Sequence, residues 1–175
     1  MSTGTTDPQA ELLIQVDEDN QIIGSIDRHT AHSEPGIYYR TISVLIFNSD
    51  DEVLVQKRSP TKDLFPNCWD LSVGGHVNFG KEYLETAVRE VGEEMGLQVS
   101  EADLIEKGAV LVHLPHSGEF FKVYEYHLKP GEHVKASVEE VADTAWMTID
   151  QMKQSMQDKS RQWYARPEQI IAALY

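Results

Sequence analysis

Apolar and polar residues alternate in the first third of the chain, which is the pattern of strands that bury one face of a sheet. Residues 12–16 and 22–26 lie on either side of an acidic turn, and they predict a β-hairpin. A second hairpin is predicted by two runs rich in aromatic and β-branched residues, 38–48 and 53–57, which a short polar turn separates.

Two later segments, residues 107–113 and 120–128, also have the composition of strands, and turn-forming residues at 115–118 separate them. Between the two halves, residues 59–68 contain two prolines and are predicted to form a loop. The pattern therefore places strands both before and after the centre of the chain.

The centre of the chain has the period of an amphipathic helix. Between residues 82 and 95 apolar side chains recur every three or four positions, which places them on one stripe that faces a core. Gly96 follows and is expected to end this helix as a left-handed cap. Two further helices are predicted at 149–158 and 167–175, the second with Pro167 at its first helical position.

Strands on both sides of a central helix, with more helices near the end, predict an α/β domain with a mixed sheet. With 175 residues, of which 41% are hydrophobic and 25% charged, the chain can bury a core without metal or disulfide support. We expect residues 1–10, which are small and polar, to form a disordered tail, and residues 11–175 to form a single domain.

Acidic residues outnumber basic ones by 29 to 15, which gives a formal net charge of −14. A field of this sign repels nucleic acid polymers and anionic membrane surfaces, and the sequence has no basic patch to offset it. The one cysteine cannot form an intramolecular disulfide, and the residues MSTGTTDPQA do not have the basic stretch and apolar core that predict a secretory leader. We therefore expect a cytoplasmic protein with neither nucleic acid nor membrane partners. The sequence leaves a homodimer open.

Three glutamates gather on one side of the central helix. Glu90, Glu93 and Glu94 stand at positions i, i+3 and i+4, so their side chains fall within about 100° of arc. Each pair of like charges at these spacings costs about 0.2–0.5 kcal/mol, and the helix dipole opposes negative charge near the C-terminal end. A bound divalent cation would reverse the sign of this cost, and oxygen ligands favour Mg²⁺ or Mn²⁺. A solvated acidic face is the structural alternative.

The sequence around these glutamates, GGHVNFGKEYLETAVREVGEEMGL, resembles the Nudix box GX5EX7REUXEEXGU, in which U is an aliphatic residue. Eight of its nine fixed or restricted positions match, and Lys81 stands where the box has its first glutamate. The likeness continues on both sides, over about residues 14–150. It implies the Nudix fold, an α/β/α sandwich with a mixed β-sheet. The matching residues are Gly75, Arg89, Glu90, Val91, Glu93, Glu94, Gly96 and Leu97.

The resemblance also implies a chemistry, the metal-dependent hydrolysis of a small-molecule diphosphate. By similarity, Glu90 and Glu94 would bind the metal ion directly, and Glu93 would ligate it or help to activate water. The carbonyl of Gly74 would complete the metal shell. The implied cofactor is Mg²⁺, with Mn²⁺ as an alternative, and roles within the three glutamates can interchange.

The first helical turns of the box carry two further expectations. Arg89 lies four residues after Glu85, a favourable spacing for an ion pair, so we expect this pair to brace the helix. Lys81 cannot accept the hydrogen bonds that a glutamate would accept at its position. A binding domain without catalysis is therefore one alternative to the hydrolase.

The isomerase branch of the superfamily supplies the other alternative. The segment VDEDNQIIGSIDRHTAH resembles isopentenyl diphosphate isomerases, in which a catalytic cysteine lies two residues before a histidine that matches His76. Gly74 occupies the cysteine position here, so the nucleophile is missing. Two metal-binding histidines of the isomerases would match His32 and His76, whereas a third falls on Tyr39. Isomerase activity is therefore not the favoured interpretation.

Basic residues must contact an anionic substrate, and several flank the strands that lead to the box. Arg40, Lys57, Arg58 and Lys62 are candidates for phosphate contacts, and His76 beside the glycine pair is another. For each of them a surface charge or a packed side chain is the structural alternative.

The general base of the reaction is expected beyond the box, as in many relatives. Glu119, Glu139 and Glu140 are the loop candidates, Glu125 is a candidate on a strand, and we favour Glu119.

Overall fold

A nine-stranded mixed sheet forms the centre of the computed structural model, which describes residues 5, 7–115 and 117–175. Its two longest strands, β3 (Ile37–Phe47) and β8 (Ser117–His127), lie side by side and are parallel. In the described part of the chain every other pairing of strands is antiparallel, so the sheet is mixed.

The other elements follow one another around these two strands. The remaining strands are β1 (Leu12–Val16), β2 (Ile22–Asp27), β4 (Val53–Arg58), β5 (Trp69–Asp70), β6 (Val73–His76), β7 (Ile105–His113) and β9 (Val141–Met147). The helices are α1 (Arg28–Ser33), α2 (Tyr83–Met95), α3 (Ile149–Gln157) and α4 (Ala165–Leu174), with a 3-10 turn at Glu101–Asp103.

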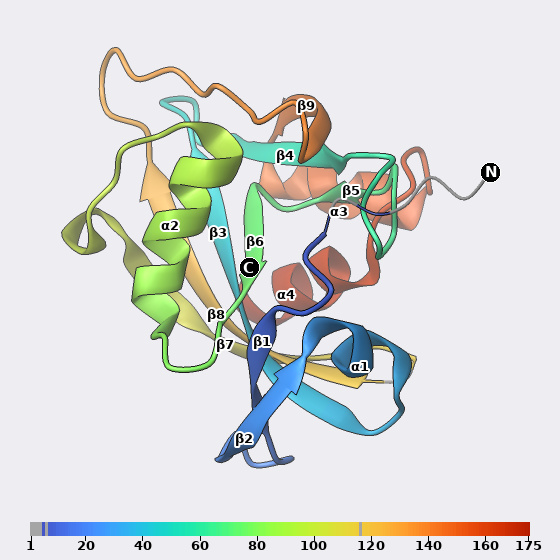
Figure 1. Cartoon of the computed structure of the whole chain (residues 1–175). Helices are drawn as coiled ribbons and strands as arrows, with labels where there is room; N and C mark the ends of the chain where they lie inside the picture. Colours follow the sequence, from blue (N-terminus) through green and yellow to red (C-terminus); the bar gives the residue numbers. More distant parts are fainter. Residues whose placement is uncertain (1–4, 6, 116) are drawn as a thin grey trace.

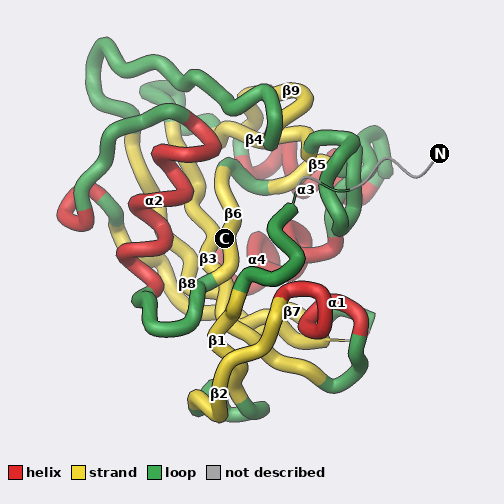
Figure 2. The backbone as a smooth tube through the Cα atoms, in the orientation of Figure 1, coloured by secondary structure: helices red, strands yellow, loops and turns green. Residues whose placement is uncertain are grey.

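Helices cover both faces of the sheet, with α2 on one face and α3 and α4 on the other (Figures 1 and 2). The strand period of two explains how β3 serves both layers. Its Ile42, Val44 and Ile46 are buried with the apolar side chains of α2. Its Leu45 and Phe47 are buried with those of α3 and α4. The predicted α/β/α sandwich with a mixed sheet is confirmed.

The central helix forms for the reason that its sequence predicts. Ala87, Val91 and Met95 recur every four residues, and all three are fully buried against the sheet. Gly96 ends the helix in the left-handed region with a φ of 65°, where glycine carries no steric cost. The predicted helix and its cap are confirmed.

Some elements differ from the sequence prediction. The first hairpin, β1 with β2, is confirmed, as is the loop over residues 59–68. In the second hairpin β3 and β4 pair at Phe47 and Val53 alone, because both strands then pair with other partners. Helix α4 begins at Ala165, so Pro167 is its third residue rather than its first. The short helix α1 has no counterpart in the prediction.

The segment before β1 is held against the domain at Asp7. Its carboxylate accepts a hydrogen bond from the Lys62 ammonium group at 2.6 Å and another from the Asp63 backbone at 2.8 Å. Asp7 is buried. These two hydrogen bonds compensate for the water that its carboxylate loses on burial. The expected disordered tail therefore does not include Asp7, and its residues 1–4 and 6 lie outside the described residues.

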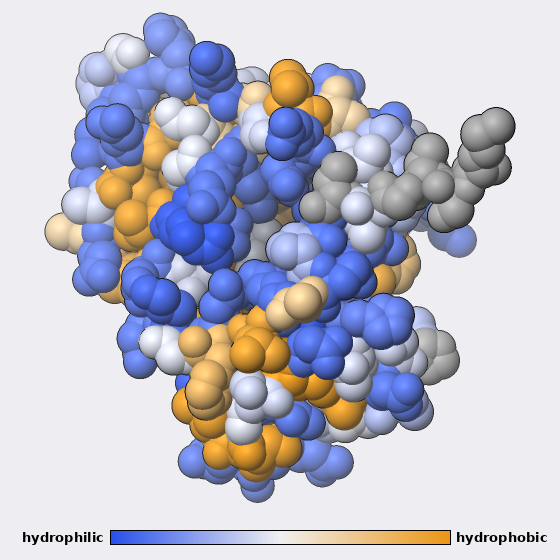
Figure 3. Space-filling model, viewed as in Figure 1, coloured by the Kyte–Doolittle hydropathy of each residue, from blue (hydrophilic) through white to orange (hydrophobic). Residues whose placement is uncertain are grey.

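The surface is unevenly polar. Hydrophilic side chains dominate the view over α2, whereas apolar side chains are exposed over β1 and β2, among them Leu12, Ile22 and Ile23 (Figure 3). No helix in the described part of the chain has the length and apolar character needed to cross a membrane.

Candidate active site

A cavity of about 180 Å³ lies beside β6, and charged side chains of both signs line it. The carboxylates come from the segment before β1, from α2, from β8 and from the loop before β9, and the cations come from α1, β4, the loop that follows β4, α2 and α4. The cavity therefore gathers residues that are far apart in the sequence. Its acidic residues are Asp7, Glu11, Glu90, Glu93, Glu94, Glu119 and Glu140, and its cations are Arg28, Arg58, Lys62, Arg89 and Arg166.

On the acidic helix face Glu94 is buried, and the side chain of Glu90 is 14% exposed. Burial, with the negative charge of Glu94, raises the pKa of Glu90 to about 8 although the Arg89 guanidinium opposes this shift. Burial likewise raises the pKa of Glu94 to about 7, against a 2.6 Å hydrogen bond that the Gln56 amide donates. Burial thus disfavours the charged form of both carboxylates, which lie one helical turn apart, and the charge of Glu94 adds to this effect on Glu90.

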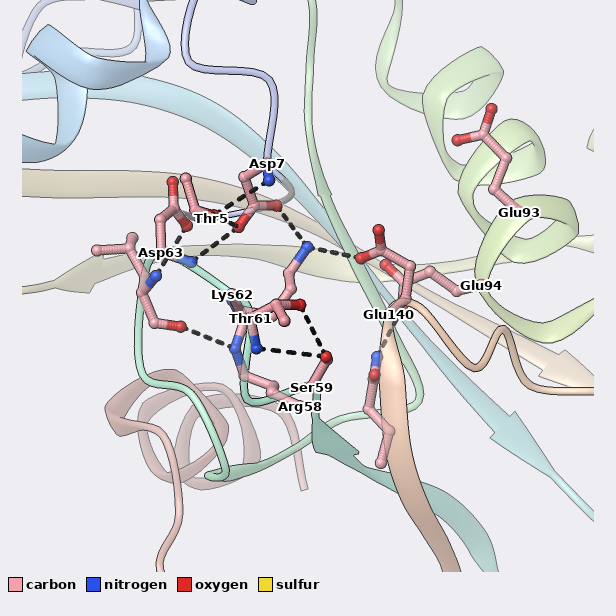
Figure 4. Close-up of polar contacts among 12 residues, drawn as sticks. Thr5, Asp7, Arg58, Ser59, Thr61, Lys62, Asp63, Glu93, Glu94 and Glu140 are labelled. Atoms are coloured by element: carbon pink, nitrogen blue, oxygen red, sulfur yellow. Dashed lines mark hydrogen bonds and ion pairs between the residues drawn. The ribbon is translucent and has the colours of Figure 1, made fainter. Parts of the chain in front are cut away.

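Glu93 lies at the edge of the cavity, and its side chain is 58% exposed. Arg89 donates one hydrogen bond to Glu93 at 2.6 Å and another to Glu90 at 2.7 Å. Figure 4 shows Glu93 apart from Glu94 and Glu140, which approach each other. The three glutamates predicted to act together therefore occupy two different environments.

The glycine pair of β6 allows two side chains to approach the strand. A Cβ atom added to Gly75 would collide with the Glu90 carboxylate, and one added to Gly74 would lie 2.7 Å from Nη2 of Arg166. Consecutive residues of a strand face opposite sides. Glu90 therefore reaches β6 from one side and Arg166 from the other.

Arg166, the second residue of α4, is bound to Asp70 of β5. Its Nε donates to both Asp70 oxygens, at 3.1 and 3.0 Å, and its Nη2 donates to one of them. The guanidinium lies over the Tyr164 ring, 4.6 Å from the ring centroid. Both ion-pair partners are buried, so the pair fixes α4 to the sheet beneath the cavity.

Glu119 lies deeper in the cavity and is 1% exposed. It stands opposite Tyr39 in the parallel register of β3 and β8, and the Tyr39 hydroxyl donates to its Oε1 at 2.8 Å. Its Oε2 is buried and has no hydrogen-bond partner among the described residues. A buried carboxylate oxygen without a donor is costly, so this oxygen fits a ligand or a water molecule in the cavity.

The two histidines that line up with isomerase ligands contact each other. Arg28 donates to Nδ1 of His76 at 3.2 Å, which places the His76 proton on Nε2. That atom lies 3.1 Å from Nε2 of His32, whose Nδ1 faces Asp63 at 3.4 Å. Burial and then the Arg28 charge hold the pKa of His76 well below its usual range, so its ring is neutral.

The model of the NUDIX domain family matches residues 37–167 of the chain. The chain belongs to this family.

Relatives of this Nudix chain include both hydrolases and isomerases by name. It is 40% identical to an uncharacterized Nudix hydrolase of Pseudomonas aeruginosa, and that match covers 51% of this chain and 52% of the relative, about half of each. It is 31% identical to the isopentenyl-diphosphate Delta-isomerase of Streptomyces avermitilis, over 93% of this chain and 83% of that one.

Solved structures share the Nudix fold. A crystal structure from Deinococcus radiodurans aligns with a TM-score of 0.80 at 23% sequence identity, and covers 94% of this chain and 99% of that one. At this identity the likeness shows the fold alone.

The Nudix helix is braced differently from the prediction. Arg89 bonds to Glu90 and Glu93 instead of Glu85, so the expected ion pair between Arg89 and Glu85 is wrong. Glu85 is paired instead with Lys81 at 2.6 Å, and both side chains are about half exposed. Lys81 thus replaces the first glutamate of the box at an exposed position two residues before α2, and it is not among the residues that line the cavity.

Two of the predicted phosphate contacts lie outside the cavity. Arg40 donates to the side chain and backbone oxygens of Asn20 at 2.9 and 2.8 Å. Lys57 faces away, because its neighbours Gln56 and Arg58 line the cavity and alternate residues of a strand face opposite sides. Arg58 is therefore in place, whereas Arg40 and Lys57 are not.

Some of the other predicted residues line the cavity, whereas others lie outside it or are already bound to protein groups. Gly74 and Glu119 line the cavity. His76 does too, but both of its ring nitrogens already have protein partners, so it offers no free donor to a phosphate. Of the remaining candidates for the base, Glu140 lines the cavity, and Glu125 instead accepts from the Tyr175 hydroxyl at 2.6 Å.

Sequence reasoning missed Gln56 and Arg166. The strand period offered a signal for Gln56, which lies two residues before Arg58 and so shares its face. Arg166 is 92 residues beyond Gly74 in a helix with no recognisable motif, and a local pattern gave no signal for it. Both are side chains whose position depends on tertiary contacts.

The donor set fits a hard divalent cation. Among the described residues no three His, Cys, Asp or Glu side chains converge closely enough to hold a metal ion by themselves. Mg²⁺ does not need such a cage, because it usually takes one or two carboxylates and completes its shell with water and substrate phosphate. Glu94, which is buried, and Glu90, which is largely buried, meet that requirement, since a bound cation would offset the cost of burying their negative charges that raises both pKa values.

Proposed function

We propose that this Nudix protein is a hydrolase that cleaves the diphosphate linkage of a small molecule, with Mg²⁺ as its metal ion. One observation carries the proposal: the largely buried pair Glu90 and Glu94 lies in a cavity that several guanidinium groups also line. An acidic pair alone would repel a diphosphate, and guanidinium groups alone would bind it without a metal ion. Their combination suits an anionic substrate that arrives with a divalent cation.

Glu90 and Glu94 would hold the metal ion, and the Gly74 carbonyl is a further ligand candidate. A bound Mg²⁺ neutralises phosphate oxygens and makes a water molecule more acidic. Glu93 would join the shell or orient water once Arg89 releases it, since Arg89 now holds its carboxylate. Mn²⁺ has the same ligand preference and can replace Mg²⁺.

Glu119 is our candidate for the general base. Tyr39 holds one carboxylate oxygen and leaves the other free, which would orient the free oxygen for accepting a proton from water. Glu140 is the second candidate because it lies near Glu94 (Figure 4). Its carboxylate, however, is already paired with Lys62 at 2.6 Å.

The isomerase remains the second candidate function because of the relatives that carry its name over most of the chain. Two features of the cavity argue against it. A side chain at position 74, where the isomerases have their cysteine, would collide with Arg166. Among the described residues that line the cavity, Pro8, Leu64 and Tyr164 supply the apolar side chains, a small surface for a prenyl group.

The test is a panel of nucleoside, sugar and prenyl diphosphates incubated with the pure protein, with and without Mg²⁺. We expect phosphate or phosphomonoester release that depends on Mg²⁺, and a loss of at least about 100-fold in kcat/KM for Glu94→Gln. Removing even an outer-sphere partner of a metal site costs about 10–100-fold, and Glu94 is a proposed direct ligand.

The control is Glu85→Gln, which alters an exposed carboxylate on the same helix and should leave the rate unchanged. Silence of the wild-type protein across the panel would contradict the hydrolase. Conversion of isopentenyl to dimethylallyl diphosphate would establish the isomerase instead.

A further inference from the structure

The cavity contains a buried cation that the Nudix box does not include. Arg166 comes from α4, lines the cavity and is 8% exposed. Its guanidinium lies against Gly74, where nearly any other residue would place a side chain. The space beside Gly74 is therefore filled by the Arg166 guanidinium of α4 and not by a side chain of β6.

The guanidinium is oriented and retains unused donors. Asp70 takes the hydrogen bonds of Nε and Nη2, and among the described residues Nη1 has no hydrogen-bond partner. A guanidinium has five N–H groups in a fixed plane, so binding at one edge leaves the rest aimed in a defined direction. The Tyr164 ring covers one of its faces.

Two buried guanidinium groups lie near the Asp70 carboxylate. Arg58 also approaches this carboxylate, at 3.6 Å, so two guanidinium groups share one buried acid. Glu119 lines the same cavity and its charge acts on Arg166, but no ion pair within 4.0 Å joins the two side chains. A buried cation without a full complement of acceptors favours an anionic ligand.

The position of β6 lets Arg166 and the acidic pair act on one ligand. Among the described strands, β6 pairs with β3 alone, so its other edge borders the cavity. Glu90 reaches this strand at Gly75 and Arg166 reaches it at Gly74. A phosphate at that edge can therefore meet a metal ion on one side and a guanidinium on the other.

We propose that Arg166 is a phosphate-binding residue of this site, oriented by Asp70 and admitted to the cavity by the absence of a side chain at Gly74. The inference rests on the proposed diphosphate substrate. The Nη1 group of Arg166 donates to a non-bridging phosphate oxygen, and this contact selects substrates with an anionic group beside Gly74. Arg166 positions the phosphate and takes no part in proton transfer.

The test measures binding of methylene diphosphonate, a diphosphate analogue that cannot be hydrolysed, by calorimetry in the presence of Mg²⁺. Arg166→Gln is expected to weaken binding by about 10–100-fold, the range for a hydrogen bond to a charged group. Mn²⁺ affinity of the free protein should change little, because Glu90 and Glu94 are intact. The matched control is Arg161→Gln, which alters an arginine that lies over Trp69 and does not line this cavity.

A second variant covers loss of folding, since Arg166→Gln leaves Asp70 without its main partner. Gly74→Ala keeps every charge but forces the guanidinium away from β6, and it should weaken diphosphonate binding while circular dichroism shows a folded protein. In the unmodified protein, the Arg166 side-chain signals in a ¹⁵N NMR spectrum should shift when diphosphonate is added. Unchanged signals, or wild-type affinity in either folded variant, would overturn the inference.

The outcome separates this inference from the hydrolase proposal. If the substrate panel is silent but diphosphonate binding depends on Arg166, the hydrolase is wrong and the binding role stands. If turnover occurs and Arg166→Gln leaves both KM and diphosphonate affinity unchanged, the hydrolase stands and the binding role is wrong.

Discussion

Each carboxylate in the cavity has its own surroundings, and these surroundings separate residues that look alike in the sequence. Glu94 is buried and Glu90 is largely buried, and both have raised pKa values, whereas Glu93 is largely exposed and bound to Arg89. Glu119 is buried with one unbonded oxygen, and Glu140 is partly exposed and bound to Lys62. Two neighbouring carboxylates withdrawn from water suit a divalent cation, whereas a general base needs a free oxygen near water.

These differences predict which of two glutamates accepts the proton. Glu119→Gln should lower kcat by about 10²–10⁴-fold, the usual contribution of a positioned general base, because an amide cannot accept a proton. The Tyr39 hydroxyl can still donate to the amide oxygen, so the melting temperature should change little. Steady-state rates on a substrate found in the panel provide the measurement.

Glu140→Gln is the comparison, and we expect the smaller loss because its carboxylate already neutralises Lys62. A larger effect of Glu140→Gln than of Glu119→Gln would assign the base to the loop before β9 instead. Equal small effects would remove both from proton transfer.

At the scale of elements, β6 and α2 together build the acidic half of the site. Helix α2 could be predicted because its apolar period and its glycine cap are local features of the sequence. The partners of its side chains could not. Arg89 donates hydrogen bonds to Glu93 and Glu90 and not to Glu85, although Glu85 and Glu93 each lie four residues from Arg89. Glu85 is instead paired with Lys81, which lies four residues before it.

The contact between β6 and α2 predicts a specific effect of one added methyl group. Gly75→Ala would force the Glu90 carboxylate away from the strand, so Mn²⁺ affinity should fall by about 10-fold or more. Overpacking of this kind should also lower the free energy of unfolding by about 1–3 kcal/mol. Titration with Mn²⁺ and urea unfolding measure the two effects.

Gly92→Ala is the control, since it adds the same methyl group within α2, where the nearest atom lies 3.6 Å away. It should leave metal affinity unchanged and raise the free energy of unfolding by about 0.5–1 kcal/mol, because glycine is unfavourable inside a helix. If Gly75→Ala binds Mn²⁺ as tightly as Gly92→Ala does, Glu90 is not held at β6 in the way we describe.

At the scale of the whole molecule, local sequence patterns predict the acidic half of the cavity, whereas long-range contacts determine its basic half. The alternating and helical patterns predicted both hairpins and the central helix, and the motif predicted the acidic half of the cavity. The basic half depends on which strand face meets the cavity and on where α4 packs. That is why Lys57 was placed in the site and Arg166 was not.

The link between α4 and the sheet makes a prediction about stability. Asp70 binds Arg166 of α4 and also lies 3.6 Å from Arg58, and all three residues are buried. Asp70→Asn would leave buried guanidinium groups without a counter-charge, which typically costs about 3–5 kcal/mol. We expect this loss in the free energy of unfolding by urea, with a corresponding fall in melting temperature.

An exposed pair provides the comparison, because the same chemical change there should have little effect. Glu85→Gln breaks the half-exposed pair with Lys81, and pairs at this helical spacing contribute about 0.3–0.5 kcal/mol. A loss below about 1 kcal/mol for Asp70→Asn would mean that water or another group compensates the guanidinium charges. In that case α4 would be held mainly by Ile170 and Ile171, which are buried against the sheet, and Arg166 would be free to move when a ligand enters.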